Sequence, residues 1–139
     1  MNEKVLLLDD EEDFLEAMSQ RMGARGMEVR TTTYPNEALK MAEEEPFDAV
    51  VMDLMLPEMD GLQVLQELRR INPRLRVILL TGYATAEKRA EAKNLGAVDL
   101  VEKPADIDIL THRIRRVGGN RMEQDTPEKG DEGRLARKL

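Results

Sequence analysis

The sequence predicts a single α/β domain built on a parallel sheet. Short runs of Val, Ile and Leu, each typical of a strand, alternate along the chain with segments whose apolar residues recur at helical spacing. Alternation of this kind is typical of repeated βαβ units, in which helices cover a parallel sheet. The chain has 139 residues, 41% of them hydrophobic, which is enough for one compact core and too few for two.

Five segments are predicted to be strands. The runs at 4–9, 47–53 and 76–81 are almost continuously apolar, as expected of strands that helices cover on both faces. The run at 27–32 alternates between apolar and polar residues, which indicates a strand at the edge of the sheet. The fifth run lies at 97–103. The sheet is therefore expected to have a buried interior and a border.

Five helices are predicted to follow these strands, at residues 12–24, 35–44, 61–70, 84–94 and 105–117. Four of them carry a stripe of apolar residues on one face, and the fourth in chain order is rich in alanine. In the first helix the stripe consists of Phe14, Leu15, Met18 and Met22. We interpret these stripes as core packing and assign them no function.

Composition excludes several kinds of site. The chain has no cysteine and a single histidine, His112, so any metal must be held by oxygen atoms. The net charge of -7 argues against direct binding to nucleic acid, which requires clustered basic residues. No run approaches the roughly 18 apolar residues of a membrane helix, and the amino terminus lacks the pattern of a secretory signal. We therefore expect a cytoplasmic protein without membrane contact.

The end of the chain differs in composition from the rest. Residues 119–139 are rich in charge and lack an apolar period, so we predict a compact domain at 1–118 and a flexible charged tail at 119–139. We expect no second domain in this tail. Whether an output domain follows it in a longer protein stays open.

Polar residues end four of the five predicted strands. Asp9 and Asp10 end the first run, Asp53 ends the third, Thr81 ends the fourth and Lys103 ends the fifth. Because ligands of open parallel sheets bind outside the carboxyl ends of the strands, we expect these side chains to converge on one site. Three neighbouring carboxylates repel one another unless a cation lies among them, and Mg²⁺ suits a site of few carboxylates. Asp53 is then a candidate nucleophile toward a phosphoryl group.

Four segments in this order, LLLDDEE, VVMDLMLPEMDG, LLTGYA and VEKP, resemble the receiver domain of two-component response regulators. The resemblance covers about residues 3–118. It implies a flavodoxin-like, doubly wound (βα)5 fold with five parallel strands in the order 2-1-3-4-5. It also implies that Asp53 accepts a phosphoryl group from a sensor histidine kinase or a histidine phosphotransfer protein.

The same resemblance assigns the metal site and its neighbours. Mg²⁺ or Mn²⁺ would be held by Asp9, Asp10, Asp53 and the backbone carbonyl of Met55. Lys103 would contact the phosphoryl group, and Thr81 would be the hydroxyl that moves on phosphorylation.

One position departs from the family pattern. Members commonly have an aromatic residue three positions before the lysine, and here that position is Leu100. We hypothesise that Tyr83, two residues after Thr81, takes part of the gating role that the aromatic ring would have.

Four residues are expected to shape loops around the site. Pro57 and Gly61 suit a tight turn into the third predicted helix. Gly82 keeps the entry to the site small. Pro104 follows the lysine, and the resemblance implies a cis peptide bond before it.

Phosphorylation is expected to change the surface of the fourth helix, fifth strand and fifth helix, for binding a downstream protein or forming a homodimer. The activity would be limited to phosphotransfer onto the chain itself and autodephosphorylation. One rival is a Mg²⁺-dependent phosphohydrolase, which would use a second acid two residues after its nucleophile, where this chain has Met55. The other is a non-phosphorylated interaction module, although such relatives usually lose an acid or the lysine.

Overall fold

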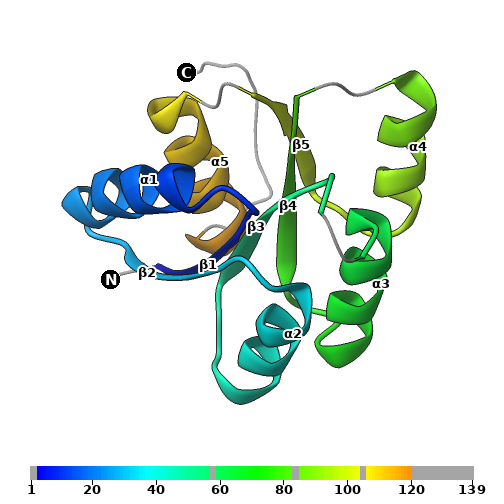
Figure 1. Cartoon of the computed structure of the whole chain (residues 1–139), viewed down its shortest axis with the longest axis horizontal. Coiled ribbons are helices and arrows are strands. Elements are labelled where there is room, and N and C mark those ends of the chain that lie inside the picture. The colour runs from blue at the N-terminus through cyan, green and yellow to red at the C-terminus, as the bar shows by residue number, and fades with distance from the viewer. Residues whose placement is uncertain (1–2, 57–58, 83–84, 104–105, 120–139) are drawn as a thin grey trace.

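The structure is a computed structural model that describes residues 3–56, 59–82, 85–103 and 106–119, with side chains described as far as residue 115. Five strands alternate with five helices, as the sequence predicts (Figure 1). In chain order the elements are β1 (Lys4–Leu8), α1 (Glu12–Ala24), β2 (Glu28–Thr32), α2 (Pro35–Glu44), β3 (Ala49–Asp53), α3 (Gly61–Ile71), β4 (Arg76–Thr81), α4 (Ala86–Asn94), β5 (Asp99–Glu102) and α5 (Ile107–Gly119). The residues predicted as a tail from 120 onward lie outside the described part of the chain.

The strands form one parallel sheet in the order β2-β1-β3-β4-β5. This confirms the predicted flavodoxin-like α/β fold. The chain runs outward from β1 to β2 and then returns to place β3 on the other side of β1, so the strand order reverses between β1 and β3. In an open α/β sheet this reversal opens a crevice at the carboxyl ends of the two strands.

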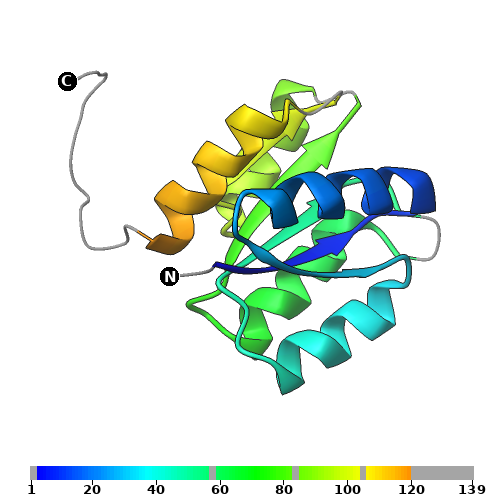
Figure 2. The same cartoon turned by 90° about the vertical axis from the view of Figure 1, so that its left-hand side faces the viewer.

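Helices cover both faces of the sheet. Buried side chains of α1 and α5 form one apolar cluster with alternate residues of β1, β3 and β4, and buried side chains of α2, α3 and α4 form the other cluster. Figure 2 shows α1 and α5 together on one side of the strands, with α2 and α3 on the opposite side. Because β1, β3 and β4 are covered twice, nearly all of their residues are buried.

The strand predicted to lie at the border of the sheet is indeed an edge strand. β2 pairs only with β1, and three of its five residues are exposed. β5 forms the opposite edge. None of the helices in the described ranges is long and apolar enough to cross a membrane.

Strand register places the functional candidates at one edge of the sheet. Leu8 pairs with Met52, Asp53 with Leu80, and Thr81 with Glu102. The residues that follow these positions therefore leave the sheet side by side. Asp9, Asp53, Thr81 and Lys103 all belong to this carboxyl edge.

Candidate functional site

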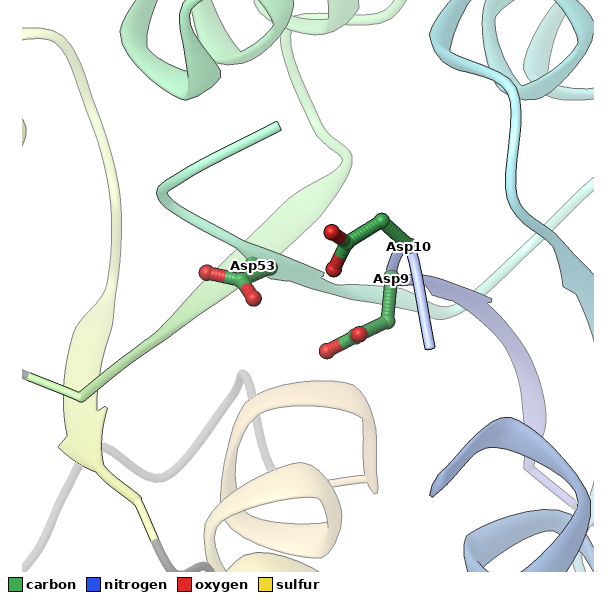
Figure 3. Close-up of side chains that lie close together, drawn as sticks. All are labelled: Asp9, Asp10 and Asp53. Atoms are coloured by element: carbon green, nitrogen blue, oxygen red, sulfur yellow. The ribbon is translucent and has the colours of Figure 1, made fainter. Parts of the chain in front are cut away.

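Three carboxylates gather at the carboxyl ends of β1 and β3 (Figure 3). Asp9, Asp10 and Asp53 each place one carboxylate oxygen within 4.8 Å of the others. Asp9 and Asp53 are buried, whereas Asp10 is exposed. Carboxylate oxygens at such separations can hold a divalent cation, and an exposed member leaves the ion room to keep water ligands. The predicted acidic site is thus present in the structure.

Lys103 joins two of these carboxylates. Its Nζ donates to Asp9 Oδ2 at 2.9 Å and to Asp53 Oδ2 at 2.8 Å. The backbone N–H of Lys103 donates to the carbonyl of Thr81 at 2.7 Å, which ties the residue to the end of β4. The lysine therefore reaches the site from the far side of β4, and it supplies the cation that the two buried acids require.

Backbone donors fix the second oxygen of each buried carboxylate. Asp9 Oδ1 accepts a hydrogen bond from the N–H of Glu11 at 2.9 Å, and Asp53 Oδ1 accepts one from the N–H of Met55 at 2.9 Å. Each carboxylate thus has one backbone donor and one lysine donor. Charge-assisted bonds of this kind are short and strong, so both side chains are held in one orientation.

Burial dominates the electrostatics of Asp9. Loss of hydration raises the pKa of its carboxyl, the hydrogen bonds from Lys103 and from the Glu11 N–H lower it in part, and the nearby charge of Asp53 raises it again. The net effect is a pKa above the ordinary value. The surroundings of Asp9 therefore disfavour its ionised form, and a cation bound beside the carboxylate would offset part of this cost.

The pKa of Lys103 is raised, although burial alone would lower it. Desolvation alone lowers the pKa of the ammonium group, but its hydrogen bonds to Asp53 and Asp9, together with their charges, outweigh desolvation and raise the pKa. Lys103 is consequently protonated throughout the physiological range. It can serve as a fixed positive charge and cannot serve as a base.

The loop that follows Asp53 is shaped by a close backbone contact. The N–H of Gly61 donates to the carbonyl oxygen of Leu54 at 3.1 Å, and a Cβ at Gly61 would lie 2.3 Å from the same oxygen. Asp60 accepts a hydrogen bond from the N–H of Leu62 at 3.0 Å and caps α3. The first turn of α3 is thereby held against the residue after Asp53.

The remaining predicted site residues differ in burial. Thr81 is fully buried at the end of β4, Leu100 is half-buried and packs on the core beneath α3 and α4, and the side chain of Met55 is exposed. A Cβ at Gly82 would meet no atom within 4 Å. The other three predicted residues, Pro57, Tyr83 and Pro104, lie outside the described residues.

Two residues near the site were not singled out by the sequence. The carboxylate of Glu11 lies 3.9 Å from Lys103 Nζ, and the ring of Phe14 lies below the same ammonium with its centroid at 4.9 Å. Phe14 belongs to the apolar stripe of α1, and nothing in that stripe distinguishes it from the methionines and leucine beside it. The run of acidic residues that precedes Phe14 was the only feature of the sequence indicating that this end of α1 borders the site.

The chain matches one protein family over most of its length. Residues 5–115 match the model of the response regulator receiver domain. Sporulation initiation phosphotransferase F of Bacillus subtilis (strain 168) is 30% identical over 116 residues, which are 84% of this chain and 94% of the relative. The chain belongs to the receiver domain family of two-component response regulators.

Other relatives are longer than this chain. The regulatory protein AtoC of Escherichia coli (strain K12) is 36% identical over 113 residues, which are 81% of this chain and only 24% of AtoC. The chain therefore corresponds to about a quarter of the length of AtoC.

Two solved structures resemble the fold closely. A response regulator protein from Burkholderia pseudomallei, solved with a phosphorylated aspartic acid, calcium ion and citrate, has a TM-score of 0.76 and 28% identity over 90% of this chain and 76% of that chain. The beryllofluoride-activated NtrC4 receiver domain dimer has a TM-score of 0.79 and 27% identity over 84% of this chain and 96% of that chain.

Proposed function

We propose that this chain is a phosphorylation switch in which Asp53 accepts a phosphoryl group from a phosphorylated histidine of a sensor kinase or phosphotransfer protein. The observation that carries the proposal is the joint placement of Asp53, Asp9 and Asp10 with the Lys103 ammonium at the reversal of strand order. A purely structural role does not require three acids and a lysine at that point, because burying the carboxylates of Asp9 and Asp53 costs free energy. The phosphorylated aspartic acid of the Burkholderia relative supports the same chemistry.

The transfer is a displacement at phosphorus. A carboxylate oxygen of Asp53 forms a new P–O bond while the P–N bond to the donor histidine breaks, and its electron pair returns to the imidazole nitrogen. The product is an acyl phosphate on Asp53. Lys103 already contacts Asp53 Oδ2, so its ammonium is in place to hold a phosphoryl oxygen as negative charge accumulates there.

A divalent cation completes this site in the proposal. Asp9, Asp10 and Asp53 supply carboxylate oxygens, and the backbone carbonyl of Met55 supplies a fourth ligand, with Mg²⁺ or Mn²⁺ as the ion. These hard oxygen donors suit either metal, and the three acids lie close enough together to share one ion. When bound, the ion neutralises charge on the phosphoryl oxygens as they approach Asp53. The structure of the Burkholderia relative contains a calcium ion, which supports binding of a divalent cation in this proposal.

The output of the switch is a change at α4, β5 and α5. In the proposal Thr81 moves toward the phosphoryl group, and Leu100 and Tyr83 adjust the packing next to it. Arg113 pairs with Asp99, and Arg89 pairs with Glu102 at 3.1 Å, so this face carries ion pairs that a shift of β5 would disturb. A downstream protein or a second copy of the chain would bind there. The dimer of the activated NtrC4 receiver domain supports the second possibility.

The proposal is tested by incubating the protein with acetyl phosphate and Mg²⁺ and measuring its intact mass. The wild type and the control Asp13→Asn, which alters an exposed acid of α1, should gain one phosphoryl group of about 80 Da. Asp53→Asn and a wild-type sample with chelated metal should not.

Two other results would replace the proposal. Continuous release of inorganic phosphate from phosphate esters, without accumulation of phosphorylated protein, would indicate a phosphohydrolase. Absence of any mass gain, with acetyl phosphate and with a phosphorylated histidine kinase alike, would indicate a non-phosphorylated interaction module.

A further inference from the structure

An aromatic ring lies against the ammonium group of Lys103. Nζ is positioned over the Phe14 ring at 4.9 Å from its centroid, while it donates to Asp9 and Asp53. A cation within about 6 Å of a ring centroid is attracted by the negative charge on the ring face. The ammonium is therefore held by the carboxylates of Asp9 and Asp53 and by one ring from α1, and the exposed carboxylate of Glu11 lies 3.9 Å away.

The position of the ring is set independently of Lys103. Phe14 lies in the first turn of α1 and is half-buried, and it packs against the apolar cluster that α1 and α5 form with the sheet. Val101 of β5 packs against the same cluster. The core thus fixes Phe14 relative to β5, the strand that immediately precedes Lys103, and the ring can act as a rigid support for a flexible side chain.

A ring is suited to this support because it attracts the charge without accepting a strong hydrogen bond. Lysine has a long flexible stem and three rotatable donors, so its ammonium is easily drawn toward water. Another carboxylate at this place would compete with Asp53 and with a phosphoryl oxygen for those donors. An aliphatic side chain would fill the space without attracting the ammonium.

We propose that Phe14 is a positioning residue for Lys103, whose ammonium it holds above the carboxylates of Asp9 and Asp53 where a phosphoryl oxygen would arrive. This inference rests on the proposed function and extends it to a residue of α1. Phe14 itself does not touch the reacting atoms. Its effect is expected on the maximal rate of phosphorylation rather than on the concentration of donor that gives half of that rate.

The test compares Phe14→Leu and Phe14→Tyr with a matched control. Phe47→Leu removes the other phenylalanine of the chain, whose ring centroid lies 5.4 Å from Lys4 Nζ at the opposite edge of the sheet. With acetyl phosphate and Mg²⁺, Phe14→Leu should lower the maximal phosphorylation rate by about threefold to tenfold, the range that a cation–π contact of this kind supports. Phe14→Tyr keeps a ring face and should stay within about twofold of wild type, as should Phe47→Leu.

A second readout does not depend on phosphorylation. In metal-free protein the ring current of Phe14 should shift the proton resonances of the Lys103 ε-methylene, and this shift should persist in Phe14→Tyr and disappear in Phe14→Leu. Unchanged resonances and an unchanged rate in Phe14→Leu would overturn the inference. Equal slowing by Phe14→Leu and Phe47→Leu, or by Phe14→Leu and Phe14→Tyr, would overturn it as well.

The two readouts separate this inference from the proposed function. A wild type that takes up no phosphoryl group would contradict the proposed function. The ring-current shift would then still support or overturn the positioning of Lys103 by Phe14.

Discussion

In the proposed metal-bound site, the Lys103 ammonium would both pair with the buried carboxylates and repel the metal ion. Its ammonium satisfies the buried carboxylates of Asp9 and Asp53 in the structure described here, yet it is also a positive charge beside the place where a divalent cation would bind. Like charges a few ångströms apart weaken each other's binding even when water screens them. In the proposed switch the lysine would therefore lower the affinity for the metal while it prepares the site for a phosphoryl group.

Lys103→Met should accordingly separate metal binding from phosphoryl transfer. The affinity for Mg²⁺ should rise by about fivefold, equivalent to about 1 kcal/mol, because a charge near the ion is removed. The phosphorylation rate should fall by at least about tenfold, because no ammonium meets the phosphoryl oxygens. Calorimetric titration with Mg²⁺ and a time course of intact mass measure the two effects. Lys40→Met, which alters an exposed residue of α2, should change neither.

Asp9 makes a pH-dependent contribution to stability. Burial raises the pKa of its carboxyl above the ordinary value of 3.8, so the folded state binds this proton more tightly than the unfolded state. Stability from this group therefore falls as the pH rises through 3.8 and through the higher pKa of the folded state. Above both pKa values the folded protein bears the full free-energy cost of the ionised Asp9 carboxylate, and below pH 3.8 this cost is absent.

Asp9→Asn should raise the Tm of the metal-free protein at pH 7 by a few degrees, because the amide is neutral at every pH. The gain should shrink as the pH is lowered toward 3.8. Thermal unfolding followed by circular dichroism at several pH values measures it. A lower Tm of the variant at pH 7 would show that the bonds from Lys103 and Glu11 outweigh the cost of burial.

The connection from β3 to α3 controls the direction in which the Asp53 side chain points. The backbone of Leu54 continues the ladder through a bond from its N–H to the Leu80 carbonyl at 2.8 Å, and its own carbonyl accepts from Gly61. The chain after Asp53 is thus fixed to β4 on one side and to the start of α3 on the other. A side chain at Gly61 would force these parts apart.

Gly61→Ala should destabilise the protein by about 2 to 3 kcal/mol, because its Cβ would overlap the Leu54 carbonyl and the backbone must move. Denaturation by urea measures the change. Gly23→Ala is the matched control, since a Cβ there meets no atom within 4 Å and alanine favours the helix by about 0.5 to 1 kcal/mol. Similar stabilities for the two variants would show that the β3–α3 connection tolerates displacement.

The helix boundaries show where sequence patterns lose precision. The sequence predicts helices from 84 and from 105, but α4 begins at Ala86 and α5 at Ile107. Thr85 accepts a bond from the N–H of Lys88 at 3.1 Å, and Asp106 accepts from the N–H of Asp108 at 2.8 Å, so each precedes its helix as a cap. Apolar periodicity locates a helix, whereas the capping side chain decides its first residue.

The fold of the whole molecule and the grouping of the site residues could be predicted from the sequence, whereas the orientations of the side chains in the site could not. Continuous apolar runs separated by helical periods determine a parallel sheet, and strand-end residues of such a sheet must meet at one edge, so the grouping of Asp9, Asp53 and Lys103 could be expected. The orientation of each side chain depends on packing between elements far apart in sequence. For that reason the contact of Phe14 with Lys103 had no sequence signal.

Metal binding should stabilise the entire domain, because the carboxylates that hold the ion come from two strands that unfold together. At a Mg²⁺ concentration about 100 times its Kd, the free energy of unfolding should increase by about 2.7 kcal/mol. Urea denaturation with Mg²⁺ and with a chelator measures the difference. Asp10→Asn should lose most of the gain, and an equal gain in this variant would place the ion elsewhere.

Locating the modification in the chain shows whether Asp53 is the residue that accepts the phosphoryl group. After phosphorylation and reductive trapping of the acyl phosphate, trypsin should separate Asp53 in the peptide 41–69 from Asp9 and Asp10 in the peptide 5–21. Fragmentation should place the modification on Asp53 and leave the peptide 5–21 unchanged. Modification of Asp9, Asp10 or any other carboxylate, with Asp53 unmodified, would contradict the account.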